Sequence, residues 1–354
     1  MRRVLLITLA FLATALSSEA QEVKNIIYLI GDGMGLTCAS MMQIDNQYNP
    51  TIFCKADNIA LQKTYSLDNR VTDSAASGTA LATGHKTNNT MLGQLPDGTN
   101  VESLMEVASQ RGKATGIVVT TYLQHATPGA FYAHVSSRHE YTKISEQLLA
   151  SDIDIAVGGG MAFFDERYGS HEEAVKAIAE SGFALYENLN EELCGERILA
   201  LVADKEVDNR SGYLAKATKQ AIDHLDTHYG DNGFVLMVEG SLIDGMGHGN
   251  NAEAQRAEMR DFMDAIEVAV EYAKLHSDTL VVVTADHGTG GLTIISGNAD
   301  FNLSEQGVEY CWSTQGHSGE MVPIYLYGTY AELINGIMEN TDLGKKLIEL
   351  IAAQ

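Results

Sequence analysis

Continuous apolar runs that alternate with helical patterns constrain the fold of this chain more than any other feature. The runs predict strands at residues 25–30, 114–120, 153–157, 198–202, 234–238, 279–284 and 322–327. Helical patterns occupy residues 34–47, 101–111, 171–181, 213–228, 252–276 and 342–352. Strands that are apolar throughout are buried on both faces. We therefore expect an α/β fold, with a central, largely parallel sheet and helices on both faces.

No Pro- or Ser-rich linker and no internal repeat divides the chain after its first 20 residues. We expect one domain over residues 21–354, with an insertion between Gly158 and Val202 as an open alternative. The triplet Gly158-Gly159-Gly160 follows a predicted strand. Because no Lys-Ser/Thr pair follows the triplet, a turn is favoured over a phosphate-binding loop.

Residues 1–20 have the pattern of a secretory signal peptide. Arg2 and Arg3 form a basic start, residues 4–16 are apolar, and Ser18-Glu19-Ala20 offers a cleavage site flanked by small residues. The apolar run is too short to span a bilayer comfortably. We expect export to a periplasm or the outside, with no membrane association after cleavage.

The formal net charge of −24 argues against nucleic acid and anionic membrane surfaces as general partners. An anionic substrate would therefore need positive charge from metal ions or from a few Arg and Lys side chains.

The chain has four cysteines, at positions 38, 54, 194 and 311. An even number permits two disulfides without fixing their pairing, and no catalytic thiol is expected.

Acidic residues stand at the ends of three predicted strands: Asp32, Glu239 and Asp286, the last followed by His287. Sites in open parallel sheets form beyond the carboxyl ends of the strands, so these acids should converge. Each acid alone could equally cap a turn. Three together favour a shared site.

Histidines accompany these acids in glycine-containing segments. Asp244 and His248 follow Glu239 in a segment that we expect to be a loop able to curl round an ion, and His317 lies in an expected flexible turn. Imidazole and carboxylate ligands without thiolate suit zinc in a catalytic site. The sequence therefore predicts a metal centre.

Ser74 directly follows Asp73 and precedes small residues that allow an abrupt helix start. Backbone N–H groups at such a start attract anions, although a serine that merely caps a packing helix fits the segment as well. After the strand at 114–120, Thr127 offers a hard oxygen ligand and Arg138 a planar cationic fork for a phosphoryl or sulfuryl group. Taken alone, Arg138 would be read as part of a surface salt bridge.

Five motifs, read together, resemble the alkaline phosphatases. They are Gly31-Asp32-Gly33-Met34-Gly35, Thr72-Asp73-Ser74-Ala75-Ala76-Ser77-Gly78, His125-Ala126-Thr127-Pro128, Glu239-Gly240-Ser241-Leu242-Ile243-Asp244 and Thr284-Ala285-Asp286-His287. Together with His317 they run in family order. The resemblance implies a three-layer fold like that of alkaline phosphatases and hydrolysis of phosphate monoesters through a phosphoserine on Ser74. It also implies two zinc ions and one magnesium ion.

The resemblance assigns a role to each motif residue. One zinc ion would be held by Asp32, Asp286 and His287, the second by Asp244, His248 and His317, and magnesium by Asp32, Thr127 and Glu239. Arg138 would clamp the phosphoryl oxygens, while Asp73 would orient neighbours such as Arg138. His125 lies beside the magnesium group.

Two positions depart from the pattern of some family members. His125 stands where some members have Asp, and Gly245 where some have Lys or His. We therefore expect altered magnesium binding and a missing phosphate contact. The chain also lacks the peripheral segments of longer members, so whether it forms a homodimer stays an open question.

The alternatives to a phosphate monoesterase are a phosphodiesterase or a sulfatase of the same superfamily, or a non-catalytic metal- or phosphate-binding protein. The Ser74 segment lacks the Pro and Arg of the sulfatase motif.

Overall fold

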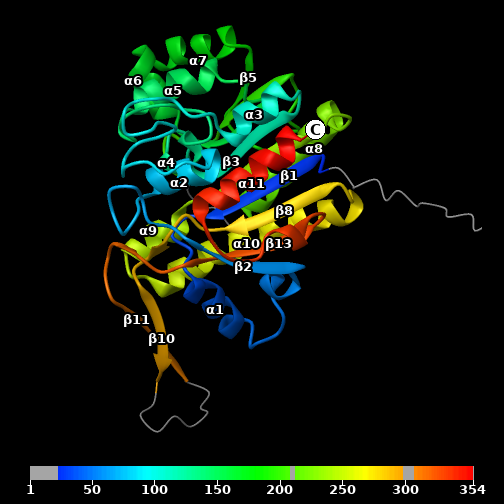
Figure 1. Ribbon diagram of the computed structural model, residues 1–354. Coiled ribbons are helices and arrows are strands. Elements are labelled where there is room, and N and C mark those ends of the chain that lie inside the picture. The colour runs from blue at the N-terminus through cyan, green and yellow to red at the C-terminus, as the bar shows by residue number, and fades with distance from the viewer. Residues whose placement is uncertain (1–22, 208–211, 298–306, 354) are drawn as a thin grey trace, which may run out of the picture.

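A ten-stranded sheet in the order β14-β2-β13-β8-β1-β7-β3-β4-β6-β5 runs through the protein (Figure 1). The computed structural model describes residues 23–207, 212–297 and 307–353, so the predicted signal peptide lies outside the described residues. The strands of this sheet are β1 Asn25–Gly31, β2 Asn58–Lys63, β3 Ala114–Tyr122, β4 Ile155–Gly159, β5 Phe183–Tyr186, β6 Arg197–Leu201, β7 Phe234–Gly240, β8 Thr279–Thr284, β13 Val322–Gly328 and β14 Gly336–Glu339. Two small sheets pair β9 Gly288–Thr289 with β12 His317–Ser318, and β10 Leu292–Ser296 with β11 Val308–Trp312.

Helices cover both faces of the sheet. They are α1 Leu36–Asp45, α2 Ser74–Thr83, α3 Leu104–Gln110, α4 Ala126–Gly129, α5 Tyr141–Ala150, α6 Met161–Tyr168, α7 His171–Glu180, α8 Tyr213–Tyr229, α9 Leu242–His248, α10 Ala252–Leu275 and α11 Asn340–Ala352, with 3₁₀ turns η1 Ile52–Lys55 and η2 Ala331–Leu333. Helices α2, α3 and α11 pack together on one face, and α1, α8 and α10 pack on the other. The predicted α/β class is confirmed.

All strand pairings in the main sheet are parallel except those of β13, which runs antiparallel to both β8 and β2. The central strands β1, β7 and β8 are buried along their whole length. Their apolar sequences therefore fit a sheet that is covered on both faces. The prediction of a largely parallel sheet is confirmed.

The segment between Gly158 and Val202 extends the main sheet, because it contributes β5 and β6 at one edge. The glycine triplet ends β4 and leads into α6. Gly160 has a φ of 115°, and a Cβ added at Gly159 would lie 1.5 Å from the carbonyl oxygen of Lys205. These glycines therefore allow a tight turn and a close backbone approach, as the preferred prediction of a turn requires.

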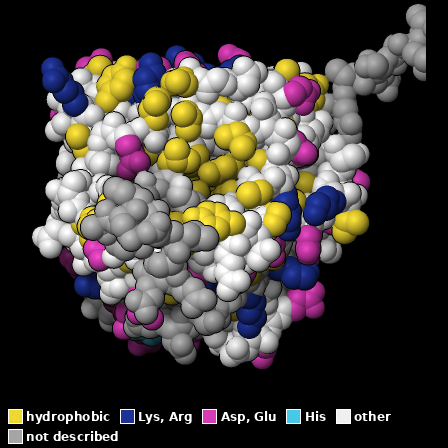
Figure 2. All heavy atoms as spheres, turned by 90° about the horizontal axis from the view of Figure 1, so that it is seen from below, with side chains coloured by type: hydrophobic (Ala, Val, Ile, Leu, Met, Phe, Trp, Pro, Cys, Tyr) yellow, Lys and Arg dark blue, Asp and Glu magenta, His cyan; other side chains and the backbone are white. Residues whose placement is uncertain are grey.

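The opposite edge of the sheet, at β14 and β2, carries exposed apolar side chains, among them Ile59, Leu333 and Ile337. Figure 2 views the molecule from this side and shows hydrophobic side chains gathered on the surface.

All four cysteines are free, so neither of the two permitted disulfides forms. Within the described part of the chain, no helix combines the length and apolar character needed to cross a membrane.

Candidate active site

Strand register brings the three strand-end acids to one edge of the sheet. Ile30 of β1 pairs with Glu239 of β7 and with Thr284 of β8. Asp32 and Asp286 each follow their paired residue by two positions, so they lie just beyond the level of Glu239. All three carboxylates are 0% exposed. The predicted convergence of these acids is therefore present in the structure.

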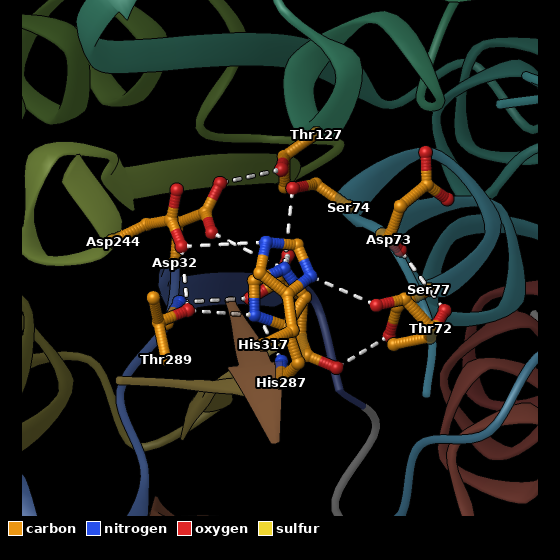
Figure 3. A network of polar contacts seen from close by, with 12 residues as sticks. Asp32, Thr72, Asp73, Ser74, Ser77, Thr127, Asp244, His287, Thr289 and His317 are labelled. Carbon is orange, nitrogen blue, oxygen red and sulfur yellow. Dashed lines mark hydrogen bonds and ion pairs between the residues drawn. The ribbon is translucent and has the colours of Figure 1, made fainter. Parts of the chain in front are cut away.

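Ser74 is the first residue of α2, and its hydroxyl faces the acids (Figure 3). Its Oγ lies 3.2 Å from Nε2 of His287. The cap of the helix is Asp73, whose Oδ1 accepts a hydrogen bond of 3.0 Å from the N–H of Ala76. The reading of Ser74 as a capping serine is therefore wrong, since Asp73 caps the helix and leaves the Ser74 hydroxyl free to face the site.

The expected loop around Asp244 is instead a helix, α9. Asp244 and His248 lie one turn apart on it, and a contact of 3.2 Å joins Asp244 Oδ2 to His248 Nε2. Two glycines disfavour a helix here, but α9 packs against α10, and tertiary packing outweighs their weak intrinsic preference. Gly245 lies between the two ligands and leaves open space, since an added Cβ would meet only Leu242, at 4.0 Å.

His317 lies in a short strand rather than in the flexible turn that the sequence predicts. Strand β12 pairs its His317 with Thr289 of β9, and the carbonyl oxygen of Thr72 lies 2.8 Å from His317 Nδ1. The His317 ring stacks on that of His287 with centroids 3.6 Å apart. Nε2 of His317 therefore points toward Asp244, whose Oδ1 is 3.6 Å away.

Thr289 and Ser241 belong to the site although sequence reasoning missed them. Thr289 donates to Asp244 Oδ1 over 2.5 Å and lies 3.2 Å from His287 Nδ1 (Figure 3). Ser241 donates to Glu239 Oε2 over 2.6 Å. Each hydroxyl stands two residues after a predicted ligand. This spacing is the signal in the sequence that could have pointed to them. In the structure both hydroxyls hold ligands in position.

A third group of ligands collects around Asp32 and Glu239. Thr127 donates to Asp32 Oδ2 over 3.3 Å. An atom of the His125 ring lies within 4.8 Å of carboxylate oxygens of both acids. The His125 ring is therefore close enough to reach an ion bound between these acids.

Arg138 lies at the rim of the site, where it contacts both Asp73 and His125. Its Nη1 donates to Asp73 Oδ2 over 3.2 Å, and its Nη2 lies 3.1 Å from His125 Nε2. Burial and the positive charge of Arg138 lower the pKa of His125 to about 3. The imidazole is thus neutral, and its Nε2 accepts from the guanidinium. Asp73 holds Arg138 as expected.

The electrostatics of the cluster favour bound cations. Burial, together with the charge of Asp286, raises the pKa of Asp32 well above its usual value, and burial raises the pKa of Glu239 to about 8. Burial also opposes ionisation of Asp244, but the hydrogen bond from His248 holds its pKa below the usual range. Crowded buried carboxylates repel one another unless positive charge lies between them.

Unpaired oxygens test whether metal ions fit. In the described part of the chain, each of the three strand-end acids has a buried carboxylate oxygen without a hydrogen bond: Asp32 Oδ1, Glu239 Oε1 and Asp286 Oδ2, the last lying 3.0 Å from His287 Nε2. Such atoms are costly to bury without a partner. Three sets of side chains bring ligand atoms within 4.8 Å of one another: Asp32–Asp286–His287, Asp244–His287–His317 and Asp32–His125–Glu239. The donor sets and their unpaired oxygens fit divalent metal ions.

Comparisons with known proteins agree with this geometry. The profile of the family described as "Alkaline phosphatase" matches residues 23–206 and 203–309. Alkaline phosphatase 3 of Bacillus subtilis is 30% identical, over 93% of this chain and 89% of its own. Alkaline phosphatase of Escherichia coli is 30% identical, over 92% of this chain and 86% of its own.

A solved structure extends the similarity to the fold. Alkaline phosphatase from the Antarctic bacterium TAB5 superposes with a TM-score of 0.87 at 34% identity, covering 94% of this chain and 99% of its own. A variant of the TAB5 enzyme, 33% identical to this chain, was solved with Mg bound in its M3 site. This chain belongs to the alkaline phosphatase family and is a metal-binding phosphatase.

Proposed function

We propose that the chain hydrolyses phosphate monoesters and that Ser74 is the nucleophile that becomes phosphorylated. The observation that carries the proposal is the 3.2 Å approach of Ser74 Oγ to His287 beside the buried acids. A serine hydroxyl is a weak nucleophile that needs activation by its surroundings. The Asp73 carboxylate is engaged by Ala76 and Arg138, so activation must come from the metal-binding side.

We infer that two zinc ions and one magnesium ion bind among these side chains. Asp32, Asp286 and His287 would hold one zinc ion, Asp244, His248 and His317 the other, and Asp32, Thr127 and Glu239 the magnesium. Bound ions would neutralise charge on the entering and leaving oxygens of the transferred phosphoryl group. The magnesium bound in the TAB5 variant supports the third assignment, and the nitrogen ligands of the other groups suit zinc.

Arg138 and the start of α2 would bind the phosphoryl oxygens. The guanidinium is fixed by Asp73 and His125, so it loses little further freedom on binding a dianion. Because Ser74 is the first residue of α2, the positive end of this helix lies at the same place. These positive groups explain how a chain with a net charge of −24 can bind an anionic substrate.

The proposed reaction has two transfers. First, Ser74 Oγ forms a bond to phosphorus as the bond between phosphorus and the ester oxygen breaks, and the Ser74 proton ends on the departing alcohol. Water then attacks the phosphoserine, which releases inorganic phosphate and restores the Ser74 hydroxyl. The in-line geometry of such a displacement requires Ser74 and the departing oxygen on opposite sides of phosphorus.

We also propose that residues 1–20 direct export and that residues 21–354 form one catalytic domain. One sheet takes strands from β1 near the start of the described chain and from β14 near its end, which supports a single domain. N-terminal sequencing of protein recovered from the periplasm or medium should begin near Gln21. Protein that stays in the cytoplasm with Met1 intact would contradict the export proposal.

Replacement of the nucleophile tests the catalytic proposal. Ser74→Ala should lower turnover of p-nitrophenyl phosphate by roughly 10³-fold or more, while zinc content, measured by mass spectrometry, stays unchanged. Ser77→Ala is a matched control on the same helix, because the Ser77 hydroxyl donates to the backbone carbonyl oxygen of Asp286 and is not among the proposed nucleophile or ligand groups. Full activity in Ser74→Ala would refute the assignment.

A substrate panel separates the proposed function from its superfamily alternatives. Turnover of p-nitrophenyl phosphate should exceed that of bis-p-nitrophenyl phosphate and p-nitrophenyl sulfate at alkaline pH. A preference for the diester or the sulfate would overturn the monoesterase proposal. Zinc binding without turnover of any of the three substrates would favour a non-catalytic binding protein.

A further inference from the structure

One face of α8, outside the candidate active site, lines a cavity of about 330 Å³. Gln220, His224 and His228 recur there at intervals of four residues, so they form one row along the helix. The opposite wall is the segment from Leu189 to Leu193. Tyr229, at the end of α8, lines a neighbouring hollow together with Ala114, the first residue of β3. The cavity therefore lies toward the amino ends of the strands, away from the acids at their carboxyl ends.

His224 is the unusual residue of this cavity. It is 3% exposed, and neither of its ring nitrogens makes a hydrogen bond of good geometry within the described chain, although the backbone of Leu193 and Glu196 lies near the ring. The side-chain oxygen of Gln220 is buried in the same way, although its amide nitrogen donates to the carbonyl oxygens of Leu189 and Glu191. Buried polar atoms are rarely left without partners. A ligand with affinity for nitrogen and oxygen lone pairs would satisfy both residues.

His228 supplies the second imidazole. Its ring centroid lies 4.4 Å from that of His224, and its Nδ1 lies 2.9 Å from the carbonyl oxygen of His224. That contact fixes the proton on Nδ1 and leaves Nε2 with a free lone pair. Histidines that bind metals commonly have this backbone hydrogen bond on the second nitrogen. Pairs of histidines four residues apart on a helix can hold one ion between them.

The charge around the pair also suits a cation. Glu191, Glu192 and Asp223 line the cavity together with the cation Lys216, and Asp223 is paired with Lys219 at 2.6 Å. Burial, together with the charge of His228, lowers the pKa of His224 to about 4, while the backbone of Leu193 and Glu196 opposes the shift.

We propose that this cavity is a second metal site, in which His224 and His228 bind one transition-metal ion of the zinc class. Oxygen from Gln220 or from water would complete its coordination. Imidazole nitrogens favour zinc, nickel and copper over calcium and magnesium. Because the site lies away from Ser74, its ion would stabilise the folded chain by mass action rather than take part in phosphoryl transfer.

Zinc content of the intact enzyme tests the proposal. Equilibrium dialysis at low micromolar free zinc should give one more zinc ion per chain for the wild type than for His224→Gln/His228→Gln. Turnover of p-nitrophenyl phosphate should be equal in the two proteins. His228→Gln alone changes an exposed side chain, so it should fold even if the double variant does not. It should weaken binding of the extra ion by roughly tenfold or more.

His171→Gln is the matched control, since it removes an exposed histidine from α7. It should keep the wild-type zinc content. Equal zinc content in the wild type and His228→Gln, with equal affinity, would overturn the proposal and leave water as the occupant of the cavity. A loss of zinc in His171→Gln that matches the loss in His228→Gln would also overturn it, because the extra zinc would then be bound nonspecifically by surface histidines.

Discussion

Gly245 has open space beside two of the candidate metal ligands. It lies within α9, between Asp244 and His248, with a negative φ that any residue can adopt. Since an added Cβ would meet only Leu242, at 4.0 Å, a side chain has room to start from this position, next to Asp244. A cation placed here would add attraction for a dianion.

We therefore predict that Gly245→Lys tightens phosphate binding. The inhibition constant of inorganic phosphate and the KM for p-nitrophenyl phosphate should both fall by a few-fold to about tenfold, and the effect should shrink at high salt. Gly245→Ala is the control. It should raise the stability of α9 by roughly 0.5–1 kcal/mol without changing the KM. A lower KM in Gly245→Ala, or an unchanged KM in Gly245→Lys, would show that charge at this position is irrelevant.

Single residues were the easiest part of the site to predict, because motifs carry the ligands directly. Asp32, Glu239, Asp286 and His287 are recognisable at strand ends without any structure. Thr289 was not recognised, because its role depends on how close its hydroxyl comes to Asp244 across two different elements. Contacts of that kind follow from packing, which the local sequence does not encode.

At the scale of elements, α3 shows how a helix start is tied to a neighbouring loop. Ser103 and Glu106 form a reciprocal capping box, and the Glu106 carboxylate also lies 2.9 Å from Nε2 of His134. The hydrogen bond to Glu106 raises the pKa of His134, which burial opposes. Burial opposes ionisation of Glu106 in turn, but the hydrogen bond to His134 holds the pKa of Glu106 below its usual value.

These shifts predict a pH window for the stability of the pair. A raised histidine pKa stabilises the fold below about pH 6.5, the unfolded value, and the gain is lost as pH rises through the folded pKa. A lowered glutamate pKa stabilises it above about pH 4.3, and that gain is lost as pH falls. His134→Gln should therefore cost about 0.5–1 kcal/mol more near pH 5.5 than near pH 9, as measured by urea unfolding.

His139→Gln serves as the control. The His139 side chain is exposed, and its ring contacts the hydroxyl and ring of Tyr141 rather than a carboxylate. Its effect on stability should not vary with pH in this way. A cost of His134→Gln that is the same at both pH values would mean that the ion pair contributes nothing and that only packing is lost.

Elements were predicted well where the hydrophobic pattern is long, and poorly where it is short. Helices α8 and α10 and the buried strands follow their patterns closely. Strand β14 has four residues, β12 has two, and α9 contains two glycines, so local preference gives little signal. These elements form because the sheet edge, the partner strand β9 and helix α10 supply the missing stabilisation.

For the whole molecule, the parallel arrangement followed from strands that are apolar along their full length. The antiparallel direction of β13 could not be predicted from its apolar sequence, since a buried strand has the same composition in either direction. The same sheet edge that collects the ligands also concentrates negative charge in the interior. The stability of the entire fold should therefore depend on the ions that the site binds.

We predict that removal of metal ions lowers the melting temperature as well as the activity. Asp32, Glu239 and Asp286 are fully buried with unpaired oxygens, so without cations their mutual repulsion acts on the folded state alone. One tightly bound ion at about 1,000 times its Kd contributes about 4 kcal/mol. Exhaustive EDTA should thus lower Tm by roughly 10 °C or more, and zinc with magnesium should restore it.

Ser74→Ala separates stability from catalysis in this experiment. Ser74 lies beside the acids but is not among the proposed ligands of the metal ions. Chelation should therefore lower the melting temperature of the variant by as much as that of the wild type, although the variant is inactive throughout. Calorimetry of both proteins, with and without EDTA, measures the two shifts. Equal melting temperatures with and without metal would mean that the buried acids are held neutral by protons, and that the ions, if bound, contribute nothing to the fold.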